Sequence, residues 1–482
     1  MNAPGFVSPD VAVPAELLSC LNAQRAAHVA APEPALAERL ADLKTLARLI
    51  RENQDAIVAA INADYGNRSE VETLFGEVFL VQAAIHDAVR RLKGWMRPRR
   101  RSVDLMTYPG ARNRVIPQPL GVVGVIVPWN FPLQLSFSPL VSIFAAGNRA
   151  MVKMSENSRR LAGLLVEMTP KFFPETKLAF FDDGGGQGPA FSSLPFDHLL
   201  FTGSSATGRA VMANAARNLT PVTLELGGKS PAIVAEDFPI KTAAERILWA
   251  KTFNAGQVCI NVDYVFLPRG AEEKFVAHCQ RLFAKRYPDV NAADYTSIID
   301  QRSYDRLRAA LEDARAKGAT LIDLAEGQKP DASRRKFPPH LVLNPTGDME
   351  LMRREIFGPI LPLRVYDRPQ EVVDFINAGD RPLAIYPFTR NAATRDFFIS
   401  RTMSGGVAVN EPMLQFAQHD MPFGGVGASG MGHYHGREGF DTFSKLRPVF
   451  QQGPLSPVQM FFQPPYSRLS RRLMDFMIKL KS

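Results

Sequence analysis

Two residues could together carry out covalent chemistry on a carbonyl group. Cys259, one of three cysteines in the chain, lies in the polar stretch FNAGQVCINVDY (253–264). A buried cysteine usually packs among aliphatic side chains, whereas this one lies in a loop that also contains Asn254, Gly256 and Gln257. Glu225 opens the stretch ELGGKSP (225–231). A thiolate can attack a carbonyl carbon to give a thioester, and a carboxylate can activate the water that hydrolyses it. Cys259 is therefore a candidate nucleophile and Glu225 a candidate general base.

Asn130, in VPWNFP (127–132), could supply the third group that this chemistry needs. Its side-chain amide can donate a hydrogen bond to a developing oxyanion, with the backbone N–H of Cys259 as the second donor. Structural interpretations compete with all three roles. Cys259 could be a packed loop cysteine, and Glu225 could bind backbone amides of the Gly-Gly turn. Asn130 could form an Asx turn before Pro132.

The elements that must position these residues follow an α/β pattern. The first hundred residues are predicted to be mainly helical. From Gly121 onward, short apolar runs alternate with helical stretches. The strands predicted in the first series are 121–129, 150–155, 178–183, 198–203 and 221–226. A second alternation begins at Pro231, and its first helix (242–253) leads into the Cys259 loop. The pattern predicts two parallel-sheet α/β domains covered by helices.

Two glycine-rich stretches could bind a dinucleotide. FTGSSATG (201–208) joins a strand to a helix, so its backbone N–H groups can face a pyrophosphate. GVGASG (425–430) matches the spacing of the dinucleotide-binding fingerprint, but no predicted strand precedes it and no apolar helix follows. We interpret the second stretch as a flexible loop that borders the active site or a subunit contact.

Several motifs together carry a family resemblance that spans nearly the whole chain. VPWNFP, KMSE (153–156), FTGSSATG, ELGGKSP and REIFGP (354–359) resemble, in order and spacing, those of the aldehyde dehydrogenase superfamily. CINVDYV and MPFGGVGASGMGHYHG resemble its class 3 branch, and KMSENS and PPYSRLSRRL resemble the coniferyl aldehyde dehydrogenase group within it.

The resemblance implies NAD(P)-dependent oxidation of an aldehyde through a cysteine thiohemiacetal and thioester. Cys259 would be the nucleophile, Glu225 the base and Asn130 an oxyanion donor. The carboxylate of Glu225 favours a free carboxylic acid as the product, since branches that pass the acyl group to coenzyme A or phosphate generally lack it. The expected substrate is aromatic, of the cinnamyl type. A fatty or other aliphatic aldehyde, and a non-catalytic scaffold that keeps the fold, are the alternatives.

The resemblance also implies a cofactor site. Its expected residues are Lys153, Glu156, Gly203, Ser204, Gly208, Glu355 and Phe357. Lys153 and Glu156 would contact the adenosine ribose, whereas Glu355 would hold the nicotinamide ribose and Phe357 would flank the ring. Because Glu156 disfavours a 2′-phosphate and Lys153 tolerates one, NAD is expected and NADP use stays open. No metal is expected, because His433 and His435 have no third ligand at suitable spacing.

By the same resemblance the chain divides into functional segments. The cofactor-binding domain would comprise 1–100 and 120–226, and the catalytic domain 227–409. Segments 101–119 and 410–455 would form a bridging or oligomerisation arm, followed by a basic amphipathic tail at 456–482.

Composition limits the partners. The net charge is +9, but no nucleic-acid-binding module accompanies it. Three cysteines and an N-terminus without a signal-peptide pattern predict a reducing, cytoplasmic location. A homodimer is the family expectation. We expect the tail to pack on its own fold or on a neighbouring subunit, with peripheral membrane contact as the alternative.

Overall fold

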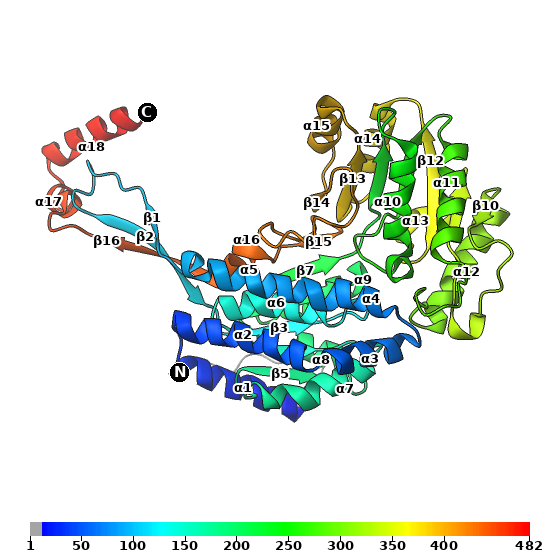
Figure 1. Cartoon of the computed structure of the whole chain (residues 1–482). Coiled ribbons are helices and arrows are strands. Elements are labelled where there is room, and N and C mark those ends of the chain that lie inside the picture. The colour runs from blue at the N-terminus through cyan, green and yellow to red at the C-terminus, as the bar shows by residue number, and fades with distance from the viewer. Residues whose placement is uncertain (1–11) are drawn as a thin grey trace.

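The computed structural model describes residues 12–482, arranged around three β-sheets (Figure 1). Residues 1–11 lie outside the described part. They begin the predicted cofactor-binding domain and belong to the N-terminal stretch that lacks a signal-peptide pattern. Two of the sheets are mainly parallel and lie in separate halves of the molecule, while the third forms an arm. The expected α/β fold with two parallel-sheet units and an arm is confirmed.

The first half contains a six-stranded sheet of order β15-β7-β6-β3-β4-β5, parallel except for β15. Its strands are β3 (Val122–Ile126), β4 (Arg149–Lys153), β5 (Leu178–Phe181), β6 (His198–Gly203), β7 (Val222–Leu226) and β15 (Gly430–Met431). Its helical elements are α1 (Ala15–Ala30), α2 (Leu36–Glu52), α3 (Gln54–Tyr65), α4 (Glu70–Thr73), the π-helix η1 (Leu74–Phe79), α5 (Leu80–Trp95), α6 (Gln134–Ala145), α7 (Arg159–Met168), η2 (Thr169–Lys171), α8 (Gly188–Ser192) and α9 (Ser205–Ala216).

Helices cover both faces of this sheet, which explains why its strands are almost wholly apolar. Val123 and Val125 of β3 face the core shared with α2, α5, α6 and α7. Val122 and Ile126 face the opposite core, shared with α1, α8 and α9. The alternation of side chains along a strand thus buries every residue of β3.

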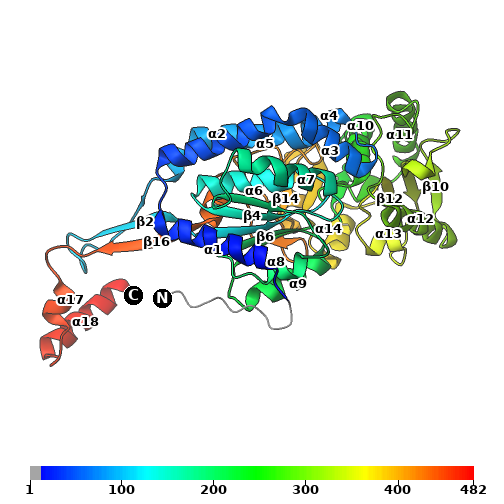
Figure 2. The ribbon, with the colours of Figure 1, turned by 90° about the horizontal axis from the view of Figure 1, so that it is seen from below.

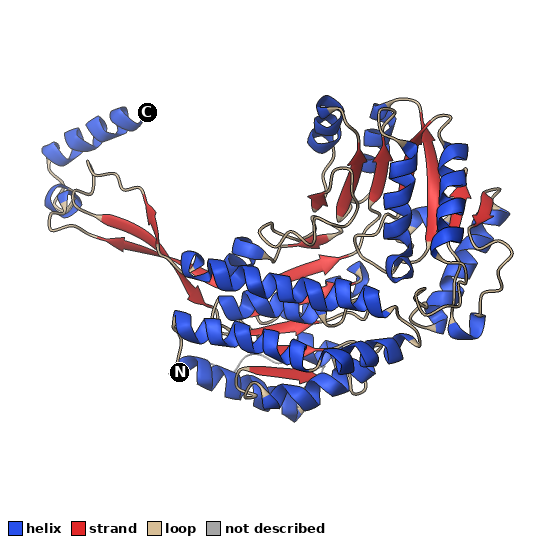
Figure 3. Ribbon diagram, viewed as in Figure 1, coloured by secondary structure: helices blue, strands red, loops and turns tan. Residues whose placement is uncertain are grey.

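The second half contains a seven-stranded sheet of order β10-β11-β12-β9-β8-β13-β14, parallel except for the β10–β11 pair (Figure 3). Its strands are β8 (Pro231–Val234), β9 (Tyr264–Pro268), β10 (Thr320–Asp323), β11 (His340–Leu343), β12 (Ile360–Tyr366), β13 (Ala384–Phe388) and β14 (Gly406–Val407). Its helical elements are α10 (Ile240–Thr252), η3 (Phe253–Gly256), α11 (Glu272–Arg286), α12 (Gln301–Ala316), η4 (Ala332–Arg334), α13 (Glu350–Arg353), α14 (Pro369–Ala378) and α15 (Ala392–Arg401).

An antiparallel arm projects away from both halves (Figure 2). It consists of β1 (Arg99–Arg101), β2 (Arg112–Pro119) and β16 (Ser444–Gln451), and it carries α17 (Pro457–Phe461) and α18 (Arg468–Lys481) at its end. The apolar side chains of α18 are largely exposed: Leu469 is 55%, Phe476 59% and Ile478 58% accessible. These side chains of the tail are therefore not packed against their own subunit. An ion pair between Lys481 of α18 and Asp104 of the arm (2.9 Å) connects the tail to the arm.

The segment 410–455, predicted to be a bridging or oligomerisation segment, lies in two different places. Only its last part enters the arm, as β16, after α16 (Gly436–Thr442). The glycine-rich stretch 424–430 instead packs against the first sheet, where β15 pairs with β7 at Glu225. A Cβ on Gly425 would lie 2.0 Å from the carbonyl oxygen of Ser429, so only glycine allows this close approach. The expected flexible loop is a packed edge that supports the strand of Glu225.

Candidate active site

The loop that carries Cys259 has an unusual backbone. α10 ends at Thr252, and three consecutive residues then adopt left-handed conformations: Asn254 (φ 51°), Ala255 (φ 48°) and Gly256 (φ 75°). Non-glycine residues in this region typically cost about 1–3 kcal/mol each and persist only where surrounding contacts hold them. The loop is therefore held by its surroundings, and it presents Cys259 beyond the C-terminal end of α10, where the helix dipole does not favour a thiolate.

Side-chain amides hold this loop from within. Asn254 Nδ2 donates to the backbone oxygens of Gln257 (3.0 Å) and Asn130 (3.3 Å). Gln257 Nε2 donates to Ser297 O (3.1 Å), and its Oε1 accepts from Ile299 N–H (3.0 Å). The polar residues that precede Cys259 in sequence are thus the ones that fix its backbone.

Cys259 lies where two cavities meet. A polar cleft of about 620 Å³ is lined by Cys259, Glu225, Asn130, Glu355 and Phe357, among others. A mainly apolar pocket of about 70 Å³ reaches the same thiol from the other side. The structure therefore brings the three expected catalytic residues together at one point.

Two carboxyl groups, the buried Glu225 and the half-buried Glu355, face the thiol. Glu225 is 3% exposed, and neither of its carboxylate oxygens has a hydrogen-bond partner among residues 12–482. Burial raises the pKa of Glu225 well above its usual range, and burial with neighbouring Asp263 raises the pKa of Glu355 to about 8. Because its oxygens are unpartnered, Glu225 does not bind the amides of the Gly-Gly turn; it is open to a group in the cleft.

The same environment controls the thiol. Burial, Glu355 and Glu225 raise the pKa of Cys259 to about 12, although the backbone N–H groups of Ile260 and Cys259 oppose this shift. The side chain is half-buried, open to the cleft but otherwise enclosed. Cys259 is therefore a protonated thiol at neutral pH in the ligand-free protein, and a positive charge or a proton acceptor is needed to activate it.

Asn130 is fixed through its backbone by a group of residues that the motifs do not mark. Its carbonyl oxygen accepts from Tyr65 Oη (3.0 Å) and Arg68 Nη1 (2.9 Å). Arg68 also pairs with Glu77 (2.9 Å), and both side chains are fully buried. The side-chain amide of Asn130 lines the cleft and donates to Gln257 O (3.3 Å). An Asx turn is not what holds it, and the amide lies beside the Cys259 loop.

A third cavity, of about 300 Å³, extends the cleft along the first sheet. It is lined by Lys153, Glu156, Gly203 and Ser204, among others. Trp129 lines both cavities and packs edge-on against Phe357 (5.4 Å between ring centroids). Six of the seven expected cofactor residues, all except Gly208, thus follow one continuous surface from Glu156 to the thiol.

Two details of this surface differ from expectation. Lys153 forms a buried ion pair with Asp183, a partner that the sequence did not reveal. Gly208 lies inside α9, where a Cβ would come within 2.7 Å of Leu226. It allows α9 to pack on β7, and it is not among the residues that line either cavity, so the geometry gives it a packing role. Ser204 instead caps α9, accepting from Thr207 N–H (3.2 Å).

The loop that bears Glu355 and Phe357 is held by charged residues from neighbouring motifs. Lys229 of ELGGKSP pairs with Asp263 of CINVDY and donates to the carbonyl oxygens of Leu351 in α13 and of Arg354 at the start of the loop. Asp263 Oδ1 accepts from Ile356 N–H (2.9 Å). These two residues lay inside quoted motifs, but their pairing could not be inferred because sequence does not show which charges meet.

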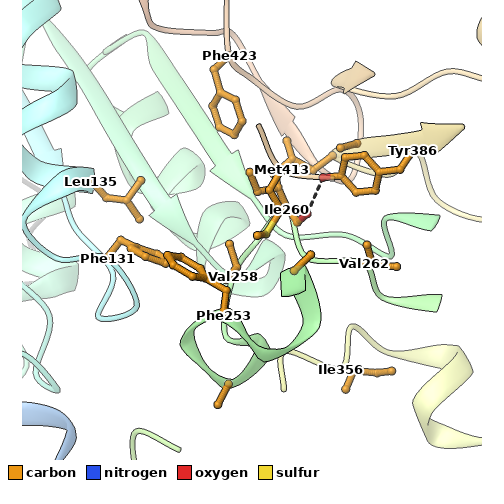
Figure 4. Close-up of a cluster of buried hydrophobic side chains, with 14 of the residues drawn as sticks. Phe131, Leu135, Phe253, Val258, Ile260, Val262, Ile356, Tyr386, Met413 and Phe423 are labelled. Atoms are coloured by element: carbon orange, nitrogen blue, oxygen red, sulfur yellow. Dashed lines mark hydrogen bonds between the residues drawn. The ribbon is translucent and has the colours of Figure 1, made fainter. Parts of the chain in front are cut away.

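Aromatic rings and aliphatic side chains together bound the apolar pocket. Phe131 stacks on Phe253 (6.0 Å between centroids, 11° between planes), and Trp249 packs against Phe253 (5.4 Å). Figure 4 shows Phe131 and Phe253 side by side, with Leu135 nearby. It also shows the Tyr386 hydroxyl donating to Ile260 O (2.5 Å), which fixes the residue after the nucleophile. Gln134 is a polar exception in the lining, and its Nε2 has no partner within the described chain.

Comparisons with known proteins identify the family. The model of the aldehyde dehydrogenase family matches residues 12–449. The chain belongs to the aldehyde dehydrogenase family. It is therefore an enzyme of the dehydrogenase class, as the motifs predicted.

Individual relatives agree with this assignment. A probable coniferyl aldehyde dehydrogenase of Pseudomonas aeruginosa is 48% identical over 452 residues, which is 93% of this chain and 94% of the relative. A coniferyl aldehyde dehydrogenase of Pseudomonas sp. is 43% identical over 466 residues, 96% of each chain. The solved structure of Staphylococcus aureus AldH in a substrate-bound state matches with a TM-score of 0.88 and 31% identity, covering 96% of this chain and 99% of the other.

The described residues also bear on membranes and metals. From residue 12 to 482, no helix of this aldehyde dehydrogenase is long and apolar enough to cross a membrane. Within that range, no group of three or more His, Cys, Asp or Glu could hold a metal ion.

Proposed function

We propose that this aldehyde dehydrogenase oxidises an aromatic, cinnamyl-type aldehyde such as coniferyl aldehyde to the carboxylic acid, with NAD as the cofactor. The observation that carries the proposal is the position of Cys259 between a cleft with two carboxyl groups and an apolar pocket lined by both aromatic and aliphatic side chains. A planar conjugated ring can stack on such walls, and the names of the relatives at 48% and 43% identity support the same substrate class.

The residues of the chain divide the reaction between them. The thiol of Cys259 passes its proton to water in the cleft and forms a bond to the aldehyde carbon, and the oxygen that becomes negative accepts hydrogen bonds from the Asn130 amide and the Cys259 N–H. With Glu355 at its nicotinamide ribose and Phe357 beside the ring, NAD would supply a positive charge near the thiol and would serve as the hydride acceptor. The thioester then remains on Cys259. Glu225, once ionised, takes a proton from water, which attacks the thioester and releases the acid and the thiol.

The cleft fits a dinucleotide, and its charges favour NAD over NADP. Glu156 lies in the part of the cleft next to the Gly203–Ser204 turn, where α9 directs its N-terminus. Lys153, which could otherwise neutralise a 2′-phosphate, is already paired with Asp183. A 2′-phosphate would therefore face the negative charge of Glu156 with little compensation. NADP use is expected to be slower rather than absent.

Reduced-nicotinamide absorbance tests the proposal directly. Purified protein and NAD would be supplied with coniferyl aldehyde, benzaldehyde, hexanal and decanal, with Cys259→Ala as the inactive control. The highest kcat/KM is expected for coniferyl aldehyde. A preference for decanal would keep the enzyme class and overturn the aromatic assignment, whereas no turnover with any aldehyde and either cofactor would favour the scaffold.

We further propose a cytoplasmic homodimer joined through the arm and tail. Exposed apolar side chains gather there, including Leu105, Met106 and Phe450 of the arm and Phe476 of α18. A second copy would bury them, and the three free cysteines suit a reducing compartment. Light scattering should give a dimer for the full chain and a weakened dimer for a chain ending at Pro465. If instead only the full chain floats with anionic vesicles, the tail is a membrane contact.

A further inference from the structure

One carboxyl group outside the reaction scheme reaches the nucleophile loop. Glu72 lies on α4 (Glu70–Thr73), and its Oε2 accepts from Asn254 N–H (3.1 Å) and from Thr296 Oγ1 (2.6 Å). The motifs of the family resemblance do not include this residue. Glu72 is half-buried, so the two hydrogen bonds place a charged oxygen inside the fold between the N-terminal helices and the second half of the molecule.

The position of the first hydrogen bond gives it a particular effect. Asn254 is the first of the three left-handed residues that lead to Cys259. The side chain of Asn254 binds the backbone oxygen of Asn130, and the side chain of Asn130 binds the backbone oxygen of Gln257. A hydrogen bond that fixes Asn254 N–H therefore constrains the positions of both Cys259 and Asn130.

Further hydrogen bonds fix the segment that carries Glu72. Ser69 N–H donates to Thr296 Oγ1 (3.2 Å), and Asn67 O accepts from Ser297 N–H (2.9 Å). The short segment 67–72 is thus bonded to the same stretch, Thr296–Ser297, that accepts from the Gln257 side chain. Glu72 is the member of this segment whose side chain bonds to the Cys259 loop.

We propose that Glu72 is a positioning residue that keeps the left-handed Asn254–Gly256 turn in the geometry that aligns Cys259 with Asn130. The proposal rests on the proposed function and adds a residue to it. Glu72 touches neither substrate nor cofactor in this scheme. It acts through Asn254, and its effect is expected on the formation of the thioester rather than on cofactor binding.

The charge state of Glu72 should matter near neutrality. The pKa of Glu72 is raised to about 7: burial raises it most, Thr296, Arg68 and Asn254 partly oppose the shift, and Asp294 adds to it. Tyr287, Tyr295 and Lys336 also lie close enough to interact with its charge. As the pH falls through about 7 the carboxylate gains a proton, and its hydrogen bond to Asn254 N–H weakens because a neutral acceptor is poorer than a charged one.

The experiment compares wild type with Glu72→Ala, Glu72→Gln and Glu70→Gln. Glu70 is the matched control, because it lies on the same helix, is exposed and carries the same charge. The first readout is the rate of the pre-steady-state burst of reduced nicotinamide with coniferyl aldehyde, together with KM for NAD. A second readout needs no turnover: the rate at which iodoacetamide alkylates Cys259, followed by mass spectrometry, since Cys20 and Cys279 are buried.

We expect the burst rate of Glu72→Ala to fall about 10²-fold, because small misplacements of reacting groups have effects of that size, with KM for NAD unchanged. Glu72→Gln should show the intermediate rate that wild type reaches at low pH, because its neutral amide oxygen can still accept from Asn254 N–H, though more weakly than a carboxylate does. The burst rate of Glu72→Gln should also lack the decline at low pH that wild type and Glu70→Gln share. A burst rate in Glu72→Ala equal to that of Glu70→Gln would overturn the proposal.

Two further outcomes are separable. If wild type does not turn over at all, the proposed function fails, and alkylation decides on Glu72: faster alkylation in Glu72→Ala than in Glu70→Gln supports a released loop, and equal rates refute it. If Glu72→Ala does not fold, Glu72→Gln decides. A Glu72→Gln profile with the wild-type low-pH decline would refute the role.

Discussion

The two cavities that meet at Cys259 are built from opposite chemistry. On one side, the cleft carries Glu225, Glu355 and the Asn130 amide, and its carboxyl groups have pKa values raised by burial. On the other side, the pocket offers aromatic and aliphatic surface, with Gln134 as a polar exception. Under the proposed function, this difference means that the cleft would determine which reaction occurs and the pocket would determine which aldehyde reaches the thiol.

The largest effect is expected on the cleft side, from Glu225→Gln. Steady-state turnover should fall by about 10²–10⁴, the usual contribution of a general base, while a single burst of reduced nicotinamide remains because thioester formation precedes hydrolysis. Wild-type turnover should rise with pH through the raised pKa of Glu225, since the carboxyl must lose its proton to act as a base. Stopped-flow absorbance measures the burst and the steady-state turnover at each pH. Loss of the burst together with turnover would contradict a role limited to hydrolysis.

Asn130→Ala should have the next largest effect. Removal of one oxyanion donor typically lowers kcat by about 10²–10³, and the NAD dissociation constant should stay unchanged. Fluorescence titration with NAD and steady-state kinetics check the two parts. Turnover near that of wild type would show that the amide does not face the oxyanion.

On the pocket side, Ala417→Phe should change the choice of substrate without changing the chemistry. Ala417 lines the apolar pocket, and a ring there would occupy space needed by an aryl group. We expect kcat/KM for coniferyl aldehyde to fall about 10–200-fold, the range of steric discrimination in apolar pockets, with a much smaller loss for acetaldehyde. Equal losses for both aldehydes would mean that the substitution reaches the cleft.

The smallest effect should come from Glu156→Gln. Loss of the negative charge should raise the preference for NADP relative to NAD about tenfold, about 1.4 kcal/mol, without altering kcat with NAD. The ratio of kcat/KM for the two cofactors is the measurement. An unchanged ratio would place the 2′-position away from Glu156.

Much of this arrangement could be predicted from the sequence, for identifiable reasons. Fully apolar runs such as Val122–Ile126 predict buried parallel strands, because both faces of such strands are covered. The closeness of Cys259, Glu225 and Asn130 was implied by motifs that occur together. The left-handed run before Cys259 could not be predicted, because Asn254 and Ala255 adopt it only through contacts with distant residues.

The ion-pair partners of two lysines and the packing role of one glycine could not be predicted from the sequence either. Nothing local shows that Lys153 meets Asp183, or that Lys229 meets Asp263. Gly208 belongs to a glycine-rich turn by spacing, and only the neighbouring Leu226 reveals why a side chain does not fit there. Tertiary contacts decide such roles, and sequence spacing carries no direct signal of them.

Trapping of the covalent intermediate tests the central claim most directly. Glu225→Gln would be mixed with NAD and coniferyl aldehyde, quenched in acid within the burst, digested and analysed by mass spectrometry. We predict one acyl group, bound as a thioester to the peptide that contains Cys259. Reduced nicotinamide formed in the burst without an acyl group on Cys259, or with the acyl group on another residue, would contradict the account.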